Sequence, residues 1–185
     1  MLAAAAAQAD RLVVGVDANA AGMATASRRA AARPSRGGLS NALFVVAAAE
    51  ALPVELDGVA DLVTVHFPWG SLLRGLLGAD PAIMSSLTRV LRPGATLQLL
   101  VSSTVRDRGA GVAPIQAETL QALAESYATW GLAVTQLRPA TLADVAAAHS
   151  SWGKRLNAGT LRPAWLLRAQ LALAGCGPAP VRSSK

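Results

Sequence analysis

Short apolar runs that alternate with Ala-rich or amphipathic segments constrain the fold of this chain most. Residues 11–17 form the first run, which is too short for a helix and ends in an acid. Such a run is typical of a buried parallel strand. Similar runs predict further strands over residues 42–47, 61–66, 95–101, 132–137 and 165–173. Because helical patterns separate these strands, the chain is expected to form a three-layer α/β sheet.

Helix start and stop signals lie between the strands. We expect helices over residues 19–32, around 72–77, from 80 to the residue before Arg92, over 118–130 and over 141–149. Pro81 suits a first helical turn, and Gly131 suits the end of a helix. Thr141 is expected as an N-cap, with Asp144 in the first turn. The segment 92–94 contains Pro and Gly and is expected to end the helix and form a turn before the next strand.

The composition supports one folded domain and excludes several classes of protein. Of 185 residues, 52% are hydrophobic and 15% are charged, which excludes a disordered chain. We expect a single domain over residues 1–175 and a flexible tail over 176–185. One cysteine, Cys176, excludes an internal disulfide and a cysteine-rich metal site, and no metal is expected. No apolar run is long enough for a membrane helix and residues 1–7 lack a basic leader, so a cytoplasmic protein without membrane contact is expected.

Arginine dominates the charge of the chain. The net charge is +6, and 15 of the 17 basic residues are arginine. A cluster of four lies within nine residues: Arg28, Arg29, Arg33 and Arg36. No acid occurs from residue 18 to residue 49, so this stretch is a candidate for binding phosphates. The alternative is an ordinary solvated face.

Acidic residues follow two of the predicted strands. Asp17 ends the first strand, where an acid can accept hydrogen bonds from ribose hydroxyls, although it can also cap the next helix. Glu50 lies in a short turn after the second strand, which is either an adenine-lining turn or a plain connection. The glycine fingerprint that should precede Asp17 is missing, since Gly15 is the only glycine before it.

Two Trp-Gly turns are candidates for holding an aromatic ligand. Pro68 and Trp69 follow the third strand, at the edge where open α/β sheets bind ligands. Trp152 is followed closely by Lys154 and Arg155, a combination that suits base stacking with phosphate contacts. The alternatives are a Trp that caps the core and a half-buried surface Trp. Trp130, Trp165 and His66 are expected to be structural.

Four motifs together resemble one enzyme family. They are Leu12-Val-Val-Gly-Val-Asp-Ala-Asn, Ala49-Glu-Ala-Leu-Pro, Phe67-Pro-Trp-Gly-Ser-Leu-Leu-Arg-Gly and Ser151-Trp-Gly-Lys-Arg-Leu. In this order and spacing they are similar to the aminoglycoside-resistance 16S rRNA methyltransferases of the kanamycin–apramycin type. Such enzymes methylate N1 of an adenine in the decoding site of the ribosome. The similarity extends from about residue 11 to residue 173.

The resemblance implies a fold, a cofactor and site residues. The fold would be the Rossmann-like sheet of class I S-adenosyl-L-methionine-dependent methyltransferases, with the first strand and Gly-rich loop missing from this chain. The resemblance places four residues at the cofactor: Asp17, Ala49, Glu50 and Ser150. It places three at the target base, where they act in catalysis: Pro68, Trp69 and Trp152. Asp17 would hold the ribose, and Ser150 would also position Trp152.

The resemblance also implies a partner, the 30S subunit with helix 44 of its 16S rRNA, bound by a monomeric enzyme. The residues that would contact this RNA are Arg28, Arg29, Arg33, Arg36, Lys154, Arg155 and Arg162. Position 160, which is basic in the family, is Thr160 here. Two alternatives remain beside an active methyltransferase. One is a truncated, catalytically impaired rRNA-binding homologue, and the other is a dinucleotide-binding oxidoreductase, which leaves both Trp-Gly turns unexplained.

Overall fold

The computed structural model describes residues 1–104, 114–150, 153 and 155–173. The helices are α1 (Leu2–Ala7), α2 (Ala20–Ala30), α3 (Gly70–Leu77), α4 (Pro81–Val90), α5 (Ala117–Ala128) and α6 (Leu142–Ala147). The strands are β1 (Val13–Asp17), β2 (Ala42–Val46), β3 (Ala60–His66), β4 (Leu91–Val101), β5 (Leu132–Pro139) and β6 (Trp165–Leu171). Each predicted strand is therefore present. The expected tail, 176–185, lies outside the described residues.

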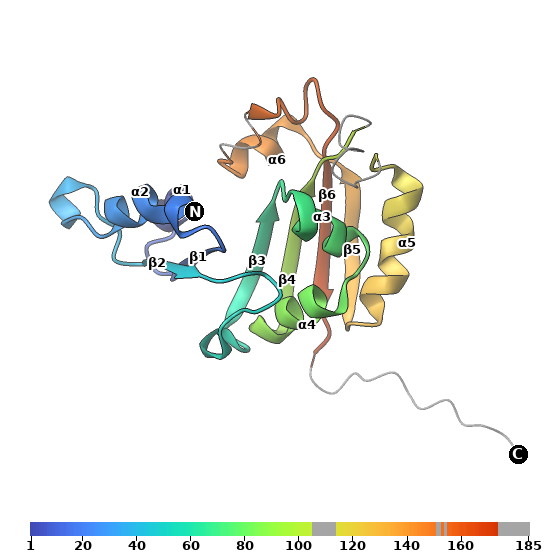
Figure 1. Ribbon diagram of the computed structural model, residues 1–185, viewed down its shortest axis with the longest axis horizontal. Helices are drawn as coiled ribbons and strands as arrows, with labels where there is room; N and C mark the ends of the chain where they lie inside the picture. Colours follow the sequence, from blue (N-terminus) through green and yellow to red (C-terminus); the bar gives the residue numbers. More distant parts are fainter. Residues whose placement is uncertain (105–113, 151–152, 154, 174–185) are drawn as a thin grey trace, which may run out of the picture.

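The strands form two sheets (Figure 1). β1 and β2 pair in parallel in a two-stranded sheet, and the other strands form a four-stranded sheet in the order β3-β4-β6-β5. β3 and β4 are parallel, whereas β6 runs antiparallel to both of its neighbours. Figure 1 shows α1 and α2 beside the small sheet, while α3, α4 and α5 accompany the large one. Within the described residues, no strand pairing joins the sheet that contains β1 to the sheet that contains β3.

The hydrogen-bond register shows which backbone amides face the unpaired edges of β3 and β1. Phe67 N donates to the Leu100 carbonyl, so the odd-numbered residues of β3 direct their amides toward β4. Amide direction alternates along a strand, so the amides of Leu62 and Thr64 face the free edge of β3. In β1, Val13 N donates to the Asn41 carbonyl on the β2 side, and the amide of Val14 faces away. Each sheet therefore ends at an unpaired parallel edge, within the described residues.

The main core lies between the large sheet and helices α3, α4 and α5. Leu97, Leu99 and Val101 alternate along β4 and point into this core, where each is almost fully buried. Tyr127 of α5 is also fully buried, and its hydroxyl donates to the Leu76 carbonyl at 3.0 Å. Burial raises the pKa of this phenol. These contacts fix α5 and α3 on one face of the sheet.

The entry into β4 differs from the prediction. The segment 92–94 was expected as a break, but α4 passes directly into β4 at Leu91. Gly94 adopts a left-handed φ of 81°, which a glycine tolerates without strain. The pairing of β3 with β4 shifts register between Ala60 and Leu62, at the level of this glycine. Pro93 and Gly94 therefore produce an irregularity within the strand and do not end it.

Three further local features follow from particular side chains. Asp80 caps α4 by accepting from Ala82 N at 3.0 Å and from Ile83 N at 3.3 Å. The end of α5 was expected at Gly131, but the helix ends two residues earlier, with Thr129 as its C-cap. Helix α1 was not predicted. The side-chain amide nitrogen of Asn41 lies 2.9 Å from the carbonyl oxygen of Ala5, which belongs to this helix. It lies at the same distance from the carbonyl oxygens of Gln8 and Arg11, which follow the helix.

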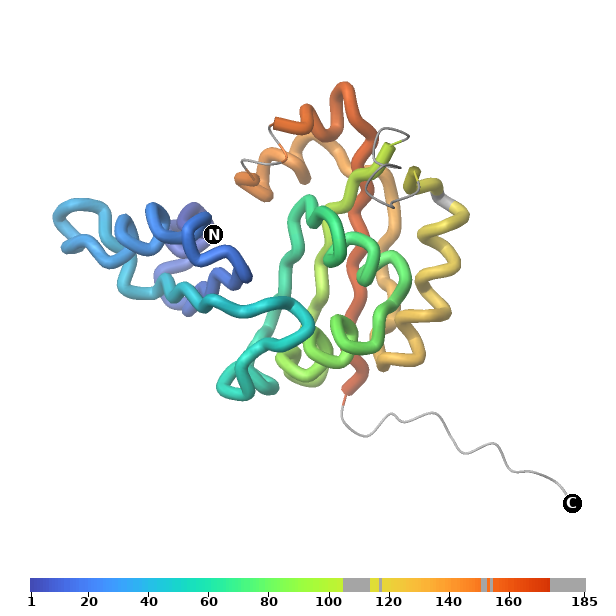
Figure 2. Tube along the Cα trace, viewed as in Figure 1, coloured from blue at the N-terminus to red at the C-terminus, as the bar shows by residue number. Residues whose placement is uncertain are grey.

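The two sheets are joined by the connector, residues 47–59, which Figure 2 shows leaving the small sheet toward the base of β3. Arg89 of α4 anchors the second part of the connector. Its guanidinium forms an ion pair with Asp57 and donates to the Leu52 carbonyl, while Gly58 N donates to the Arg89 carbonyl at 2.9 Å. Ser86 Oγ accepts from Leu52 N at 3.1 Å.

Within the described ranges, no helix is long and apolar enough to cross a membrane.

Candidate functional site

The turn after β3 carries the first predicted Trp. Phe67 has a left-handed φ of 51° and is 3% exposed, and its amide donates to the Leu100 carbonyl at 2.7 Å. Pro68 is buried. Trp69 occupies the N-cap position of α3, and its side chain is 43% exposed. The backbone is thus fixed by buried neighbours while the indole of Trp69 stays accessible to a flat ligand.

The second Trp-Gly turn follows α6. Trp152 and Lys154 lie outside the described residues. Ser150 Oγ accepts a hydrogen bond from Gly153 N at 3.0 Å, which closes the turn. The backbone of Gly153 packs against the ring of Phe67, since a Cβ built on Gly153 would lie 2.6 Å from Phe67 Cε2. The fold therefore brings the two turns into contact, although they are more than eighty residues apart in the sequence.

A second, smaller core lies beneath these turns. It contains Phe67, Leu100, Ala148, Ala158, Ala164 and Leu166. Leu100 points to the face of β4 opposite the main core, because side chains alternate along a strand. The small side chains of Ala148, Ala158 and Ala164 let this part of the chain approach the sheet closely. Phe67 was not among the predicted site residues. The only signal in the sequence was an aromatic residue directly after an apolar strand.

Helix α6 is held in place by a charged network. Asp144 receives both ends of the Arg138 guanidinium, at 2.6 and 2.9 Å, and it completes a capping box with Thr141. The hydrogen bonds from Arg138 and from Thr141 hold the pKa of Asp144 well below its usual range, against a smaller effect of burial. The predicted N-cap is confirmed. Because α6 immediately precedes the second turn, this network fixes where that turn begins.

His66, the last residue of β3, is half-buried. Burial and the nearby positive charge of the N-terminus lower the pKa of His66, and the Ala148 backbone opposes this shift. The neutral imidazole is therefore favoured, which agrees with a structural residue.

Asp17, Ala49 and Glu50, three of the four predicted cofactor residues, lie at or just after the C-terminal ends of β1 and β2, whereas Ser150 lies after α6. Asp17 Oδ1 accepts from Asn19 N at 2.8 Å, and no other described group donates to this carboxylate. The N-cap of α2 is Asn19, whose side chain accepts from Gly22 N at 3.2 Å, so Asp17 is not the helix cap. Ala49 is half-buried and Glu50 is exposed. One oxygen of Asp17 is thus available to a ribose hydroxyl, which fits the nucleoside end of the expected cofactor.

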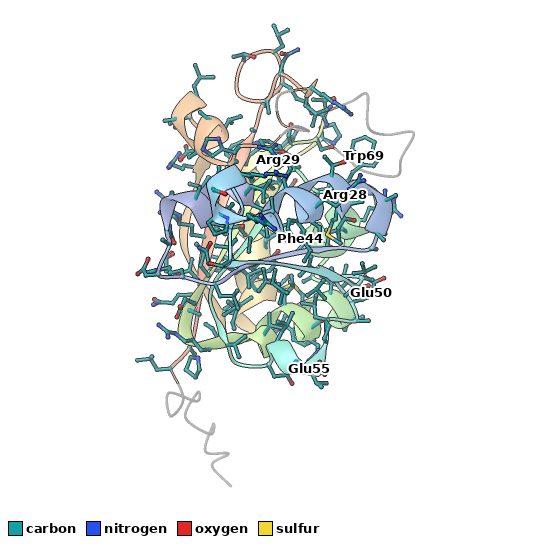
Figure 3. The ribbon with its side chains drawn as sticks, turned by 90° about the vertical axis from the view of Figure 1, so that its left-hand side faces the viewer. Arg28, Arg29, Phe44, Glu50, Glu55 and Trp69 are labelled. Carbon is teal, nitrogen blue, oxygen red and sulfur yellow. The ribbon has the colours of Figure 1, made fainter. Side chains whose placement is uncertain are left out.

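The arginine cluster forms a basic hollow. A surface hollow of about 380 Å³ is lined by Thr25, Arg28, Arg29, Ala32, Arg36 and Gly37. Arg33 is exposed but does not line it. Figure 3 shows Arg28, Trp69 and Glu50 along the same border of the molecule. Three guanidinium groups around one hollow form an electropositive concavity that suits a phosphate backbone.

The remaining predicted arginines differ in their surroundings. Arg155 is exposed. Arg162 is half-buried, and its guanidinium donates to the side chain and the carbonyl of Ser102 at 2.9 and 3.3 Å. Ser102 is 3% exposed and follows β4 directly. Within the described residues, no group of three or more His, Cys, Asp or Glu side chains is placed to hold a metal ion.

Comparison with known proteins identifies the family. Residues 1–171 match the family described as NpmA, 16S rRNA (adenine(1408)-N(1))-methyltransferase. The chain belongs to this family. A 16S rRNA (adenine(1408)-N(1))-methyltransferase of Streptoalloteichus hindustanus is 39% identical over 153 residues, which are 80% of this chain and 70% of that protein.

Solved structures of the family share the fold. A mutant 16S rRNA (adenine(1408)-N(1))-methyltransferase of Catenulisporales acidiphilia, solved with its cosubstrate SAM, gives a TM-score of 0.83 at 32% identity. The match covers 96% of this chain and 82% of that chain. The aminoglycoside resistance methyltransferase NpmB1 gives a TM-score of 0.75 at 33% identity over 92% of this chain and 81% of that chain. The family resemblance and the class I methyltransferase fold are both confirmed.

Proposed function

We propose that this chain is the S-adenosyl-L-methionine-dependent methyltransferase that modifies N1 of adenine 1408 in 16S rRNA. The match of residues 1–171 to the family carries this proposal. The exposed Trp69 at the C-terminal end of β3 supports it, because this edge is where open α/β sheets bind ligands. The expected consequence for a host is aminoglycoside resistance, to kanamycin and apramycin; the relative NpmB1 is named an aminoglycoside resistance methyltransferase.

The cofactor would lie at the ends of β1 and β2. Asp17 would hold the ribose through its available oxygen, and Ala49 and Glu50 would flank the adenine. Ser150 would approach from the second turn. When bound, S-adenosyl-L-methionine would supply an electrophilic methyl group on a sulfonium sulfur. The lone pair of adenine N1 would attack this carbon while the carbon–sulfur bond breaks and S-adenosylhomocysteine leaves.

The target base would be held between aromatic side chains. Adenine N1 is inaccessible in a helical stack, so the base has to be flipped out. Pro68 and Trp69 would contact one face and Trp152 the other. N1 has no proton to lose before it is methylated, so the chain needs no general base. Its task is to orient the base, and the indoles would also stabilise the positive charge that develops on the ring.

The partner surface would combine the basic hollow with the second turn. Arg28, Arg29 and Arg36 would contact phosphates of 16S rRNA in the assembled 30S subunit, next to helix 44. The other contacts would come from Arg33, Lys154, Arg155 and Arg162. One copy of the chain would dock on each subunit.

Primer extension on treated 30S subunits tests the function. Methylation of N1 blocks base pairing, so reverse transcription of 16S rRNA should stop at adenine 1408 only when S-adenosyl-L-methionine is present. Subunits that carry guanine at this position are the matched control. A stop at another adenine, or a stop that does not depend on the methyl donor, contradicts the proposal.

Titration of S-adenosylhomocysteine into the chain tests the cofactor part of the proposal. Binding supports the enzyme, whereas tight 30S binding without S-adenosylhomocysteine binding contradicts it.

A further inference from the structure

Phe67, at the end of β3, contacts the chain that follows α6 at two points. It belongs to the same buried cluster as Ala148. Its ring lies directly against Gly153. The residue that leads into Trp69 therefore holds both Ala148 and Gly153.

The contact between Phe67 and Gly153 leaves no room for a side chain. A Cβ on Gly153 would lie 2.6, 2.8 and 3.3 Å from Phe67 Cε2, Cδ2 and Cζ. The ring has little space into which it can retreat, because Phe67 is 3% exposed and belongs to the second core with Leu100 and Ala148. Glycine at position 153 is therefore required by the ring it faces.

The backbone at both turns is strained in the same way. Phe67 has φ 51° and His149 has φ 46°, so each turn is preceded by a non-glycine residue in the left-handed region. Side chains rarely adopt this conformation, and it persists only where the surroundings determine it strongly. Such strain is concentrated at functional sites. Here it redirects the chain just before Trp69 in one turn and just before Ser150 in the other.

We propose that Phe67 and Gly153 are positioning residues for methyl transfer. Their contact sets the separation between the Trp69 turn and the turn around Gly153, and hence the width available to a flat base. This inference rests on the proposed function. A base between two aromatic groups needs a gap of about 3.5 Å on each face. A methyl group inserted between Phe67 and Gly153 changes that separation without touching substrate, cofactor or reacting atoms.

A size-exchange series tests the proposal. In Gly153→Ala we expect the single-turnover methylation rate to fall about 100-fold, because a misplacement of about 1 Å has effects of this size. In Phe67→Leu we expect a smaller loss, about tenfold. The double variant should be faster than Gly153→Ala alone, since the smaller leucine makes space for the added methyl group. Gly22→Ala is the matched control, because its Cβ would lie 3.4 Å from the nearest side-chain atom.

Two binding readouts separate positioning from loss of fold. S-adenosylhomocysteine affinity and 30S affinity should stay at the level of the unsubstituted chain in all variants. Fluorescence of 2-aminopurine, placed at the target position of the rRNA, should report base stacking that is altered by Gly153→Ala and restored in the double variant. A thermal melt confirms that each variant is folded, and Phe67→Leu remains informative if Gly153→Ala does not fold.

The outcomes distinguish this inference from the function on which it rests. If the unsubstituted chain neither methylates adenine nor changes the 2-aminopurine signal, the proposed function fails and the inference fails with it. If the unsubstituted chain is active and Gly153→Ala is equally active, only the inference is overturned. Additive losses in the double variant also overturn it, because two residues in contact should show coupling.

Discussion

Arg162 Nε donates a hydrogen bond to Ser102 Oγ over 2.9 Å, which joins the segment before β6 to the end of β4. The Ser102 hydroxyl in turn donates to the Pro163 carbonyl, so the buried serine is held from two sides. Arg162 therefore has a structural contact in addition to the rRNA contact that we propose for it.

Arg162→Ala is expected to lower the free energy of unfolding by about 1–3 kcal/mol, because it removes charge-assisted hydrogen bonds to a buried residue. Thermal or urea denaturation measures this loss. Arg155→Ala is the matched control. Because Arg155 is exposed, this substitution should lower 30S affinity but change the free energy of unfolding little. Equal stability of the two variants would show that the bonds to Ser102 contribute nothing.

Trp69→Ala is expected to abolish most methylation while S-adenosylhomocysteine binding is retained. The indole is 43% exposed, so its removal leaves no large cavity. Loss of base stacking accounts for about 1–3 kcal/mol. Trp152→Ala is expected to behave in the same way. Trp69→Phe should keep part of the activity, and full turnover by both alanine variants contradicts the assignment.

Reversal of charge in the basic hollow is expected to weaken 30S binding. Arg28→Glu, Arg29→Glu and Arg36→Glu each remove a phosphate contact, so the dependence of log Kd on log salt should flatten by about 0.7–0.9 per contact. Binding is measured at several salt concentrations. Arg168→Gln is the control, because Arg168 is exposed on β6 and bonds Gln98 at 2.8 Å. An unchanged salt dependence in the hollow variants removes this surface from the proposal.

The Asp144 network makes stability depend on pH. The folded protein holds the pKa of Asp144 below its unfolded value, mainly through Arg138 and then through Thr141. The stabilisation is therefore fully present above about pH 4, the usual carboxyl range, and is lost as the pH falls through the folded pKa. Denaturation measured from neutral to strongly acidic pH should show a weaker acid dependence in Asp144→Asn. An identical acid profile would exclude this contribution.

The free sheet edges predict a pattern of hydrogen exchange. The amides of Val14, Leu62 and Thr64 face unpaired edges, whereas that of Val65 faces β4. Exchange followed residue by residue should be fast at the first three and slow at Val65. Slow exchange along all of β3 would mean that its edge is paired in solution.

Much of the fold was predictable because hydrophobic periodicity determines which segments are buried. The runs near residues 13–17 and 60–66 gave β1 and β3 directly, and Thr141 gave the start of α6. The prediction failed where tertiary contacts override local signals. Pro93 and Gly94 lie inside β4, because the register shift against β3 accommodates them. Helix α1 depends on Asn41, which is distant in the sequence and has no local signature.

The site was predictable only as separate motifs. The two Trp-Gly turns were recognised from their residue types, but the contact between Phe67 and Gly153 is a property of the folded chain. In the same way, the sequence presents Arg162 as one more cation, and only the fold places it against Ser102. Charge density predicted the arginine cluster, while the hollow it lines depends on the 3-10 turn at 34–36.

The anchored connector is a short link between the part of the chain that carries the arginine hollow and the part that carries Trp69. Ala47 N still bonds the Asp17 carbonyl and Leu52 is already fixed on α4, so only residues 48–51 link the two sheets covalently without an anchor. The five residue steps from Ala47 to Leu52 span at most about 17 Å when fully extended. If the arginine hollow binds the RNA backbone as proposed, Trp69 would meet its base at a high effective concentration, so a weak base contact would be sufficient for occupancy.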